Sequence, residues 1–202
     1  AQPGASDYLQ TIILNPGTYT IDNEVMMTNK VVICGKPGNP ADVIVDVQNK
    51  NKAFCLNHAS ARLESLTVYR AKCTGVNSYG VVRICSPNGR GNQTNSTLGA
   101  GDGGIVSNVV LTACAASDKF TGQLLLVNAG AGVATHCVIT NCTAWQQSDG
   151  SGGGMFLQVG AGRADNCLVA NNSFECRDSG GIKDETCSSS VRVEGGTLVN
   201  CT

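Results

Sequence analysis

Three variable segments of the chain each contribute an aspartate, and the three side chains could together bind a cation. They are Asp118, Asp149 and Asp178. Carboxylate oxygens are the ligands that Ca²⁺ prefers in proteins. If the segments that carry these aspartates stack beside one another, the sequence predicts a row of carboxylates along one edge of the molecule.

Basic and aromatic residues accompany these aspartates. Lys119 follows Asp118 directly, Arg177 precedes Asp178, and Trp145 is the only tryptophan of the chain. A cation, carboxylates and an aromatic ring in one place favour binding of Ca²⁺ and a sugar. The alternative interpretation is a solvated loop, because Ser-Asp and Gly are ordinary turn residues. Neither interpretation assigns a catalytic residue.

Cysteine is unusually abundant, with 11 in 202 residues, and an odd number cannot pair completely within one chain. A buried free cysteine behaves as a small hydrophobic residue. Core positions are therefore expected for the cysteines that lie in apolar segments: Cys114, Cys137, Cys142, Cys167 and Cys201. Cys73 and Cys85 are expected nearer to loops. Cys176 and Cys187 flank one loop and could close it by a disulfide.

A resident metal site is not predicted. No Cys-x-x-Cys pair occurs, and His58 and His136 lack the spacing of zinc ligands. Four basic residues of the first half are expected on a solvated sheet face: Arg62, Arg70, Lys72 and Arg83.

Internal repeats identify the elements that position these residues. Segments 105–114, 133–142 and 163–172 align without gaps, and each has a polar residue followed by alternating apolar residues. The aligned columns are Val109, Cys137 and Cys167; Leu111, Ile139 and Val169; and Cys114, Cys142 and Asn172. Such alternation is typical of strands and excludes a helical repeat.

A second short strand is predicted before each aligned segment, at 53–57, 81–85, 124–128, 155–159 and 191–194. The repeat is therefore strand, tight turn, strand, Asn corner and variable loop. The variable loops are expected at 115–122, 143–154 and 173–189. A propeller blade would need about 40 residues, more than this period supplies. The sequence predicts an all-β solenoid, a parallel β-helix of about six coils, as one domain over 1–202 with a long inserted loop at 86–104.

The first coils resemble a known superfamily. Pro16-Gly17-Thr18-Tyr19 and the Gly-x-x-Gly-x-Pro segment 35–40 are similar to the opening of right-handed parallel β-helix proteins of the pectate-lyase-like superfamily. The segments 133–142 and 195–202 resemble repeats of large bacterial surface β-helix proteins. Because this fold hosts lyases, hydrolases, adhesins and structural proteins, the resemblance implies a fold more than an activity.

The resemblance also implies what an enzyme of this fold would need. Its lyases use Ca²⁺-binding carboxylates with a Lys or Arg base, and its hydrolases use close aspartates. No Asp-Asp pair occurs in the sequence. Members of the group carry a capping helix before the first strand, and none precedes it here. We therefore expect either a piece of a longer protein or a module whose uncapped ends associate with neighbouring coils.

Composition narrows the remaining function classes. The net charge is −1, which disfavours a nucleic-acid partner, and no apolar run reaches the roughly 20 residues of a membrane helix. The leading hypothesis is an extracellular or cell-surface structural or adhesive module that self-associates end to end, without a cofactor. The alternatives are a Ca²⁺-dependent polysaccharide lyase and a carbohydrate-binding module.

Overall fold

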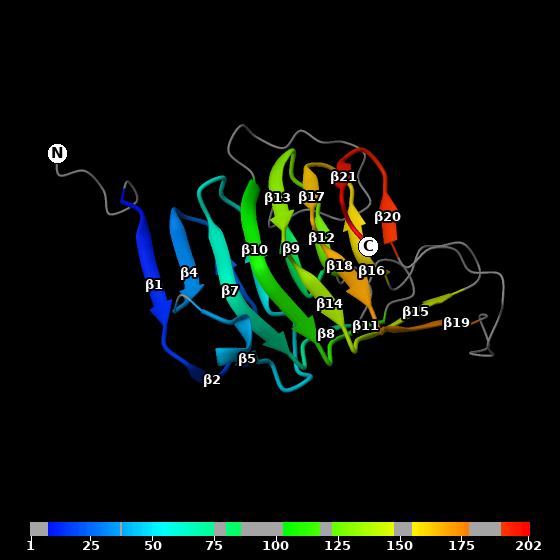
Figure 1. The fold of residues 1–202 in the computed structure, drawn as a ribbon, viewed down its shortest axis with the longest axis horizontal. Coiled ribbons are helices and arrows are strands. Elements are labelled where there is room, and N and C mark those ends of the chain that lie inside the picture. The colour runs from blue at the N-terminus through cyan, green and yellow to red at the C-terminus, as the bar shows by residue number, and fades with distance from the viewer. Residues whose placement is uncertain are drawn as a thin grey trace.

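Three parallel sheets lie along the molecule in the computed structural model, of which two include strands of the first coils and the third begins only at Lys72 (Figure 1). The structure describes residues 8–36, 38–74, 80–85, 103–117, 123–147, 155–177 and 191–202. Every strand pair within these ranges is parallel, and the two partners come from successive turns of the chain. This arrangement confirms the predicted parallel β-helix.

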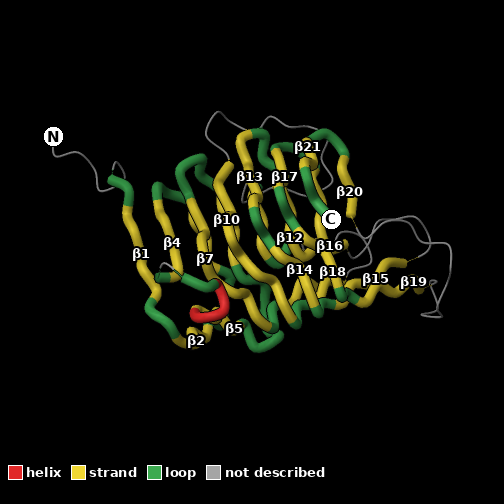
Figure 2. Tube along the Cα trace, in the orientation of Figure 1, coloured by secondary structure: helices red, strands yellow, loops and turns green. Residues whose placement is uncertain are grey.

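Sheet 1 is the largest of the three and contains eleven strands. They are β1 (Gln10–Leu14), β2 (Gly17–Thr20), β4 (Val31–Gly35), β5 (Val43–Asp46), β7 (Arg62–Tyr69), β10 (Gly103–Thr112), β13 (Ala131–Thr135), β14 (Val138–Thr140), β17 (Arg163–Asp165), β18 (Leu168–Ala170) and β21 (Thr197–Val199). One short 3₁₀ helix (Pro40–Asp42), drawn red in Figure 2, precedes β5.

The other two sheets complete each coil. Sheet 2 contains β3 (Val25–Met27), β6 (Phe54–Leu56), β9 (Val82–Ile84), β12 (Gln123–Val127), β16 (Met155–Val159) and β20 (Val191–Val193). Sheet 3 contains β8 (Lys72–Thr74), β11 (Ala115–Ser117), β15 (Thr143–Gln147) and β19 (Ser173–Arg177). The described residues contain no helix that is long and apolar enough to cross a membrane.

Sheet 3 corrects the predicted repeat. The segments expected to be variable loops begin as strands, which pair in the order β19-β15-β11-β8. Alternate residues of these strands face the core, since Ala116 and Ala144 are buried and Phe174 packs edge-on against Phe156 at 6.1 Å between ring centroids. The alternation spans too few residues and uses side chains too small to be visible in the sequence. Only pairing with neighbouring coils shows it.

The register confirms the predicted columns. Val138 lies between Val110 and Leu168, so that each aligned cysteine or aliphatic residue stands directly opposite its counterpart on the next coil. Because adjacent strands lie about 4.8 Å apart, like side chains stack upon like side chains and exclude water from a narrow core. The inward column of sheet 1 includes Leu63, Val106 and Ala134, all 0% exposed.

Two rows of corner residues turn the chain between strands. The first row has positive φ angles near 50° at Ser65, Asn108, His136, Asn166 and Asn200. The second has them at Arg70, Ala113, Asn141 and Asn171. Asparagine tolerates this left-handed conformation better than most residues do. The residue after each corner points into the core, which explains why a cysteine so often follows an asparagine.

The cysteine predictions are partly confirmed. Cys114, Cys137, Cys142 and Cys167 are buried, whereas Cys201 is half-buried. Cys73 and Cys85, which the sequence placed nearer to loops, are also buried. Their positions within and at the end of short strands, β8 and β9, account for the difference.

Candidate functional site

The predicted loop site lies largely outside the described residues. This applies to Asp118, Lys119, Asp149 and Asp178. It applies also to Cys187, and hence to the predicted disulfide with Cys176. The structure describes Trp145 within β15 and the backbone of Arg177 at the end of β19.

The strands that lead into this site are side by side. Trp145 is half-buried and lies opposite Ser117 on one neighbouring strand and Glu175 on the other. Gln147 lies opposite Arg177 at the ends of β15 and β19, which run together in Figure 1. The three segments therefore start in register, one coil apart, as stacking of the loops requires.

A buried ion-pair cluster is the most concentrated group of charges among the described residues. The Arg83 guanidinium donates two hydrogen bonds to the Glu24 carboxylate, Nε to Oε1 at 2.8 Å and Nη2 to Oε2 at 3.0 Å. Lys52 Nζ lies 3.4 Å from Glu24 Oε2. The side chain of Arg83 is only 7% exposed and that of Glu24 13%. The prediction of a solvated face was thus wrong for Arg83.

The reason for this burial lies in sheet 2. Side chains alternate between the two faces of a strand. The row of Cys55, Arg83, Leu126 and Gln158 faces away from the inward row that contains Ile84 and Leu125, yet it is at most 6% exposed. Met26, the member of this row on β3, is 43% exposed, but the middle of sheet 2 is covered on both faces. An arginine there needs a partner, because an unpaired buried charge is strongly unfavourable.

Two thiols adjoin this ion pair. A hydrogen bond from the Cys55 thiol lowers the pKa of Cys85, and the positive charge of Arg83 acts in the same direction against burial. The same interaction raises the pKa of Cys55. Burial alone would lower the pKa of Arg83, but the negative charges of Cys85 and Glu24 outweigh it and raise that pKa. Arg83 therefore remains charged at all ordinary pH values.

The geometry of this cluster ties coils together. Glu24 precedes β3 and Arg83 belongs to β9, while β6 lies between these two strands in sheet 2. The ion pair thus spans three successive coils. The alternating residues Val-Val-Arg-Ile-Cys predicted the strand that contains Arg83. They did not indicate that Arg83 pairs with Glu24, which lies 59 residues away.

Thiols make the corresponding contacts in the later coils. Each buried sulfur donates to a carbonyl two residues earlier and lies near a carbonyl of the preceding coil. Cys137 Sγ lies 3.5 Å from Thr135 O and 3.6 Å from Val106 O. Cys142 Sγ lies 3.2 Å from Thr140 O and 3.4 Å from Leu111 O. Within the described ranges, no three histidine, cysteine or acidic side chains form a group that could hold a metal ion.

Comparison with known proteins identified no relative of this chain. No family model, no curated protein and no solved structure matches this chain. Functional inference therefore rests on the chain's own residues and their arrangement.

Proposed function

We propose that the chain is an extracellular structural or adhesive β-helix module that associates end to end. The support comes from the way its strongest polar contacts are used. The Glu24–Arg83 pair and the core thiols connect one coil to the next. A solenoid built in this way is a rigid rod that displays its variable segments along one edge.

The proposal of self-association rests on one inward column of apolar side chains in sheet 1. Ile12, Ile33 and Leu63 lie opposite one another on successive strands, and at the other end of sheet 1 Ala164 lies opposite Leu198. The interior members are buried, whereas Ile12 is 49% exposed and Leu198 37%. Stacking of the last coil of one copy on the first coil of another would bury both side chains and pair the backbone at the strand edges. Because such a contact is head to tail, it propagates into a filament.

Sedimentation velocity over rising protein concentration tests this proposal, with electron microscopy of the largest species. We expect growing assemblies for the unaltered chain and a monomer for Ile12→Lys, because the lysine would place a charge in the stacked interface. Val110→Lys is the matched control, since half-buried Val110 lies between Thr67 and Val138 on interior strands of sheet 1, away from either end. A chain that stays monomeric at every concentration contradicts end-to-end association.

The second candidate function is carbohydrate binding or lysis, and the row of Ser117, Trp145 and Glu175 favours it. An indole beside a carboxylate, at the base of segments that contain Asp118 and Asp149, suits a sugar ring. Kinship with the pectate-lyase-like superfamily belongs to this second proposal. An ultraviolet assay for unsaturated uronides on acidic polysaccharides with added Ca²⁺ tests lysis. A binding assay with Trp145→Ala tests recognition.

A further inference from the structure

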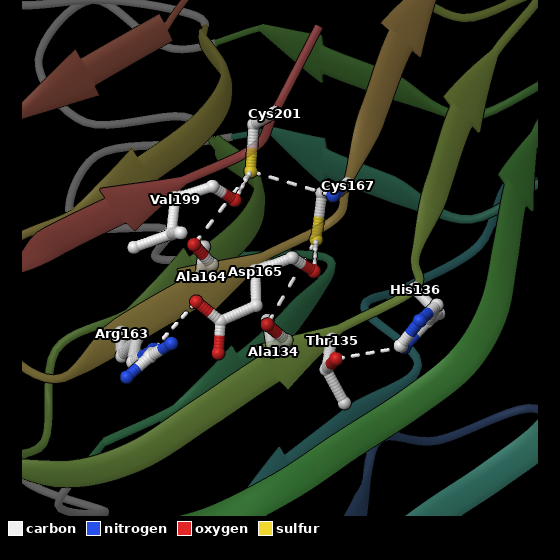
Figure 3. Close-up of polar contacts among 9 residues, drawn as sticks. All are labelled: Ala134, Thr135, His136, Arg163, Ala164, Asp165, Cys167, Val199 and Cys201. Atoms are coloured by element: carbon white, nitrogen blue, oxygen red, sulfur yellow. Dashed lines mark hydrogen bonds and ion pairs between the residues drawn. The ribbon is translucent and has the colours of Figure 1, made fainter.

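Three cysteines occupy one column on successive coils. Cys137, Cys167 and Cys201 each follow a corner residue of the first row, and Figure 3 shows the side chains of Cys167 and Cys201. Cys137 and Cys167 are 0% and 2% exposed, whereas Cys201 is half-buried. Cys201 is therefore the most exposed of the three in the single, unassociated chain.

Backbone contacts fix Cys167 and Cys201 opposite each other. Thr202 N donates to Cys167 O at 3.0 Å, and Val169 N donates to Thr202 O at 2.7 Å. The Cys201 sulfur accepts a hydrogen bond from Cys167 N at 3.3 Å. Neighbouring parallel strands lie about 4.8 Å apart. This spacing falls within the Cα separation of roughly 4.4–6.8 Å that disulfides adopt.

The thiols of Cys167 and Cys201 differ in pKa and in exposure, so each suits a different step of thiol–disulfide exchange. A hydrogen bond from the Cys137 thiol lowers the pKa of Cys167 to about 7, against the effect of burial. Burial raises the pKa of Cys201. Cys167 is thus the better thiolate but is buried, whereas Cys201 is half-buried and is the more exposed of the two in the unassociated chain. Because the thiolate is the nucleophile in disulfide exchange, the two positions suit two successive steps.

We propose that Cys167 and Cys201 are a dithiol site that reacts with a small disulfide such as glutathione disulfide and becomes an inter-coil disulfide. In the first step the Cys201 thiolate attacks one sulfur of glutathione disulfide, which releases one glutathione thiolate. In the second step the Cys167 thiolate attacks the Cys201 sulfur and displaces the second glutathione. Two protein thiols are oxidised, one glutathione disulfide is reduced to two glutathiones, and the protons of the two cysteines pass to the released thiolates.

The test is incubation of the complete 202-residue chain with glutathione disulfide, alkylation of the remaining thiols, and mass spectrometry of the intact chain and of its unreduced peptides. We expect Cys167 and Cys201 to lose their free thiols, a peptide pair linked through these two residues, and no glutathione retained on either of them. A product that keeps glutathione on Cys201, a disulfide that joins Cys167 or Cys201 to a different cysteine, or no reaction at these two residues overturns the proposal.

Variants separate the two steps. Cys167→Ala should stop the reaction at a stable glutathione adduct on Cys201, and Cys201→Ala should leave Cys167 reduced. Because Cys201 is half-buried, the second variant tests the site even if the first folds poorly. Cys34→Ala is the matched control, because half-buried Cys34 lies opposite Ile13 and Glu64 rather than another cysteine. It should react as the unaltered chain does, and a lost crosslink in this variant counts against the assignment.

Discussion

The early and late coils are held to their neighbours by different interactions. In the described part of the early coils, most ion pairs connect residues of different coils, as in Glu24–Arg83 and Asp46–Arg70, and Arg62–Glu64 is the exception within one strand. Among the described residues of the late coils, the ion pairs join residues of the same strand or turn, as in Arg163–Asp165. There the contacts between coils are the apolar columns and the bonds from thiols to carbonyls.

The difference shows two ways of stacking coils. A column of small, uncharged side chains repeats indefinitely, because each coil offers its neighbour the same surface. A charged pair connects particular coils only, because each charge requires one partner at one position. The early coils are thus specified by unique contacts and the late coils by repetition. The following predictions test this distinction.

The largest effect is expected for Glu24→Gln. The substitution leaves the enclosed Arg83 guanidinium without its anion, and removal of one member of a buried pair costs about 3 kcal/mol of unfolding free energy. Urea denaturation measures the loss. Glu194→Gln is the matched control, because its partner Arg192 is 47% exposed and lies in the same coil. That control should change stability by less than about 0.5 kcal/mol, and an equal loss in both variants would remove the distinction.

A smaller effect is expected in the thiol column. Cys137→Ala removes a fully buried sulfur and its contacts with two carbonyls, at a cost of about 1.5 kcal/mol. Cys137→Val should cost about 0.5 kcal/mol or less, because Val109 already occupies this column one coil earlier. Denaturation of both variants measures the difference. If valine is the worse of the two, the column depends on sulfur chemistry rather than on packing.

Two residues of the second row of corners, Ala113 and Asn141, permit reciprocal substitutions. Ala113 has a φ of 53° and Asn141, one coil later, has a φ of 52°. Because alanine is strained in this conformation, Ala113→Asn should stabilise the chain by about 0.5–1 kcal/mol, and Asn141→Ala should destabilise it by about 1 kcal/mol. Thermal unfolding of the two variants gives the signs. Shifts in the same direction would show that the corner conformation does not govern these positions.

The smallest effect concerns acid. Hydrogen bonds from Arg70 lower the pKa of Asp46 below the ordinary value of an aspartate in the folded state, against the effect of burial. The unfolded chain then binds a proton more readily, so that this contribution to stability is present above about pH 4 and is lost as pH falls below that value. Asp46→Asn should flatten this part of the stability profile. Because Arg70 is 41% exposed, the effect should also shrink in high salt, and a salt-independent profile would contradict the pairing.

Much of the fold could be predicted from the sequence. Leu111, Ile139 and Val169 align without gaps because each performs the same packing task in its own coil. The corner asparagines are visible for the same reason, since every coil must turn at the same place. The third strand of each coil was missed because Ala116 and Ala144 carry little hydrophobic signal. The burial of Arg83 was missed because an alternating pattern does not show what covers the outer face of a strand.

For the candidate site, only the strands that lead into it could be predicted from the sequence. The sequence placed Trp145 at the start of a stacked segment, and the register of β11, β15 and β19 confirms the stacking of the strands that lead there. The predicted ligand residues Asp118, Asp149 and Asp178 remain a prediction, because they lie outside the described ranges. These carboxylates lie in segments of unequal length and do not recur at equivalent positions of successive coils. The repeat period therefore cannot predict where they lie.

The sequence by itself determined the repeat, the corners and the inward columns, because these features depend on contacts between identical positions of adjacent coils. Only the tertiary structure decided which charges meet and which faces are covered. The Glu24–Arg83 pair crosses an intervening coil and joins residues that are 59 positions apart in the sequence. Contacts of this kind occur once each, and a single occurrence leaves no pattern in the sequence.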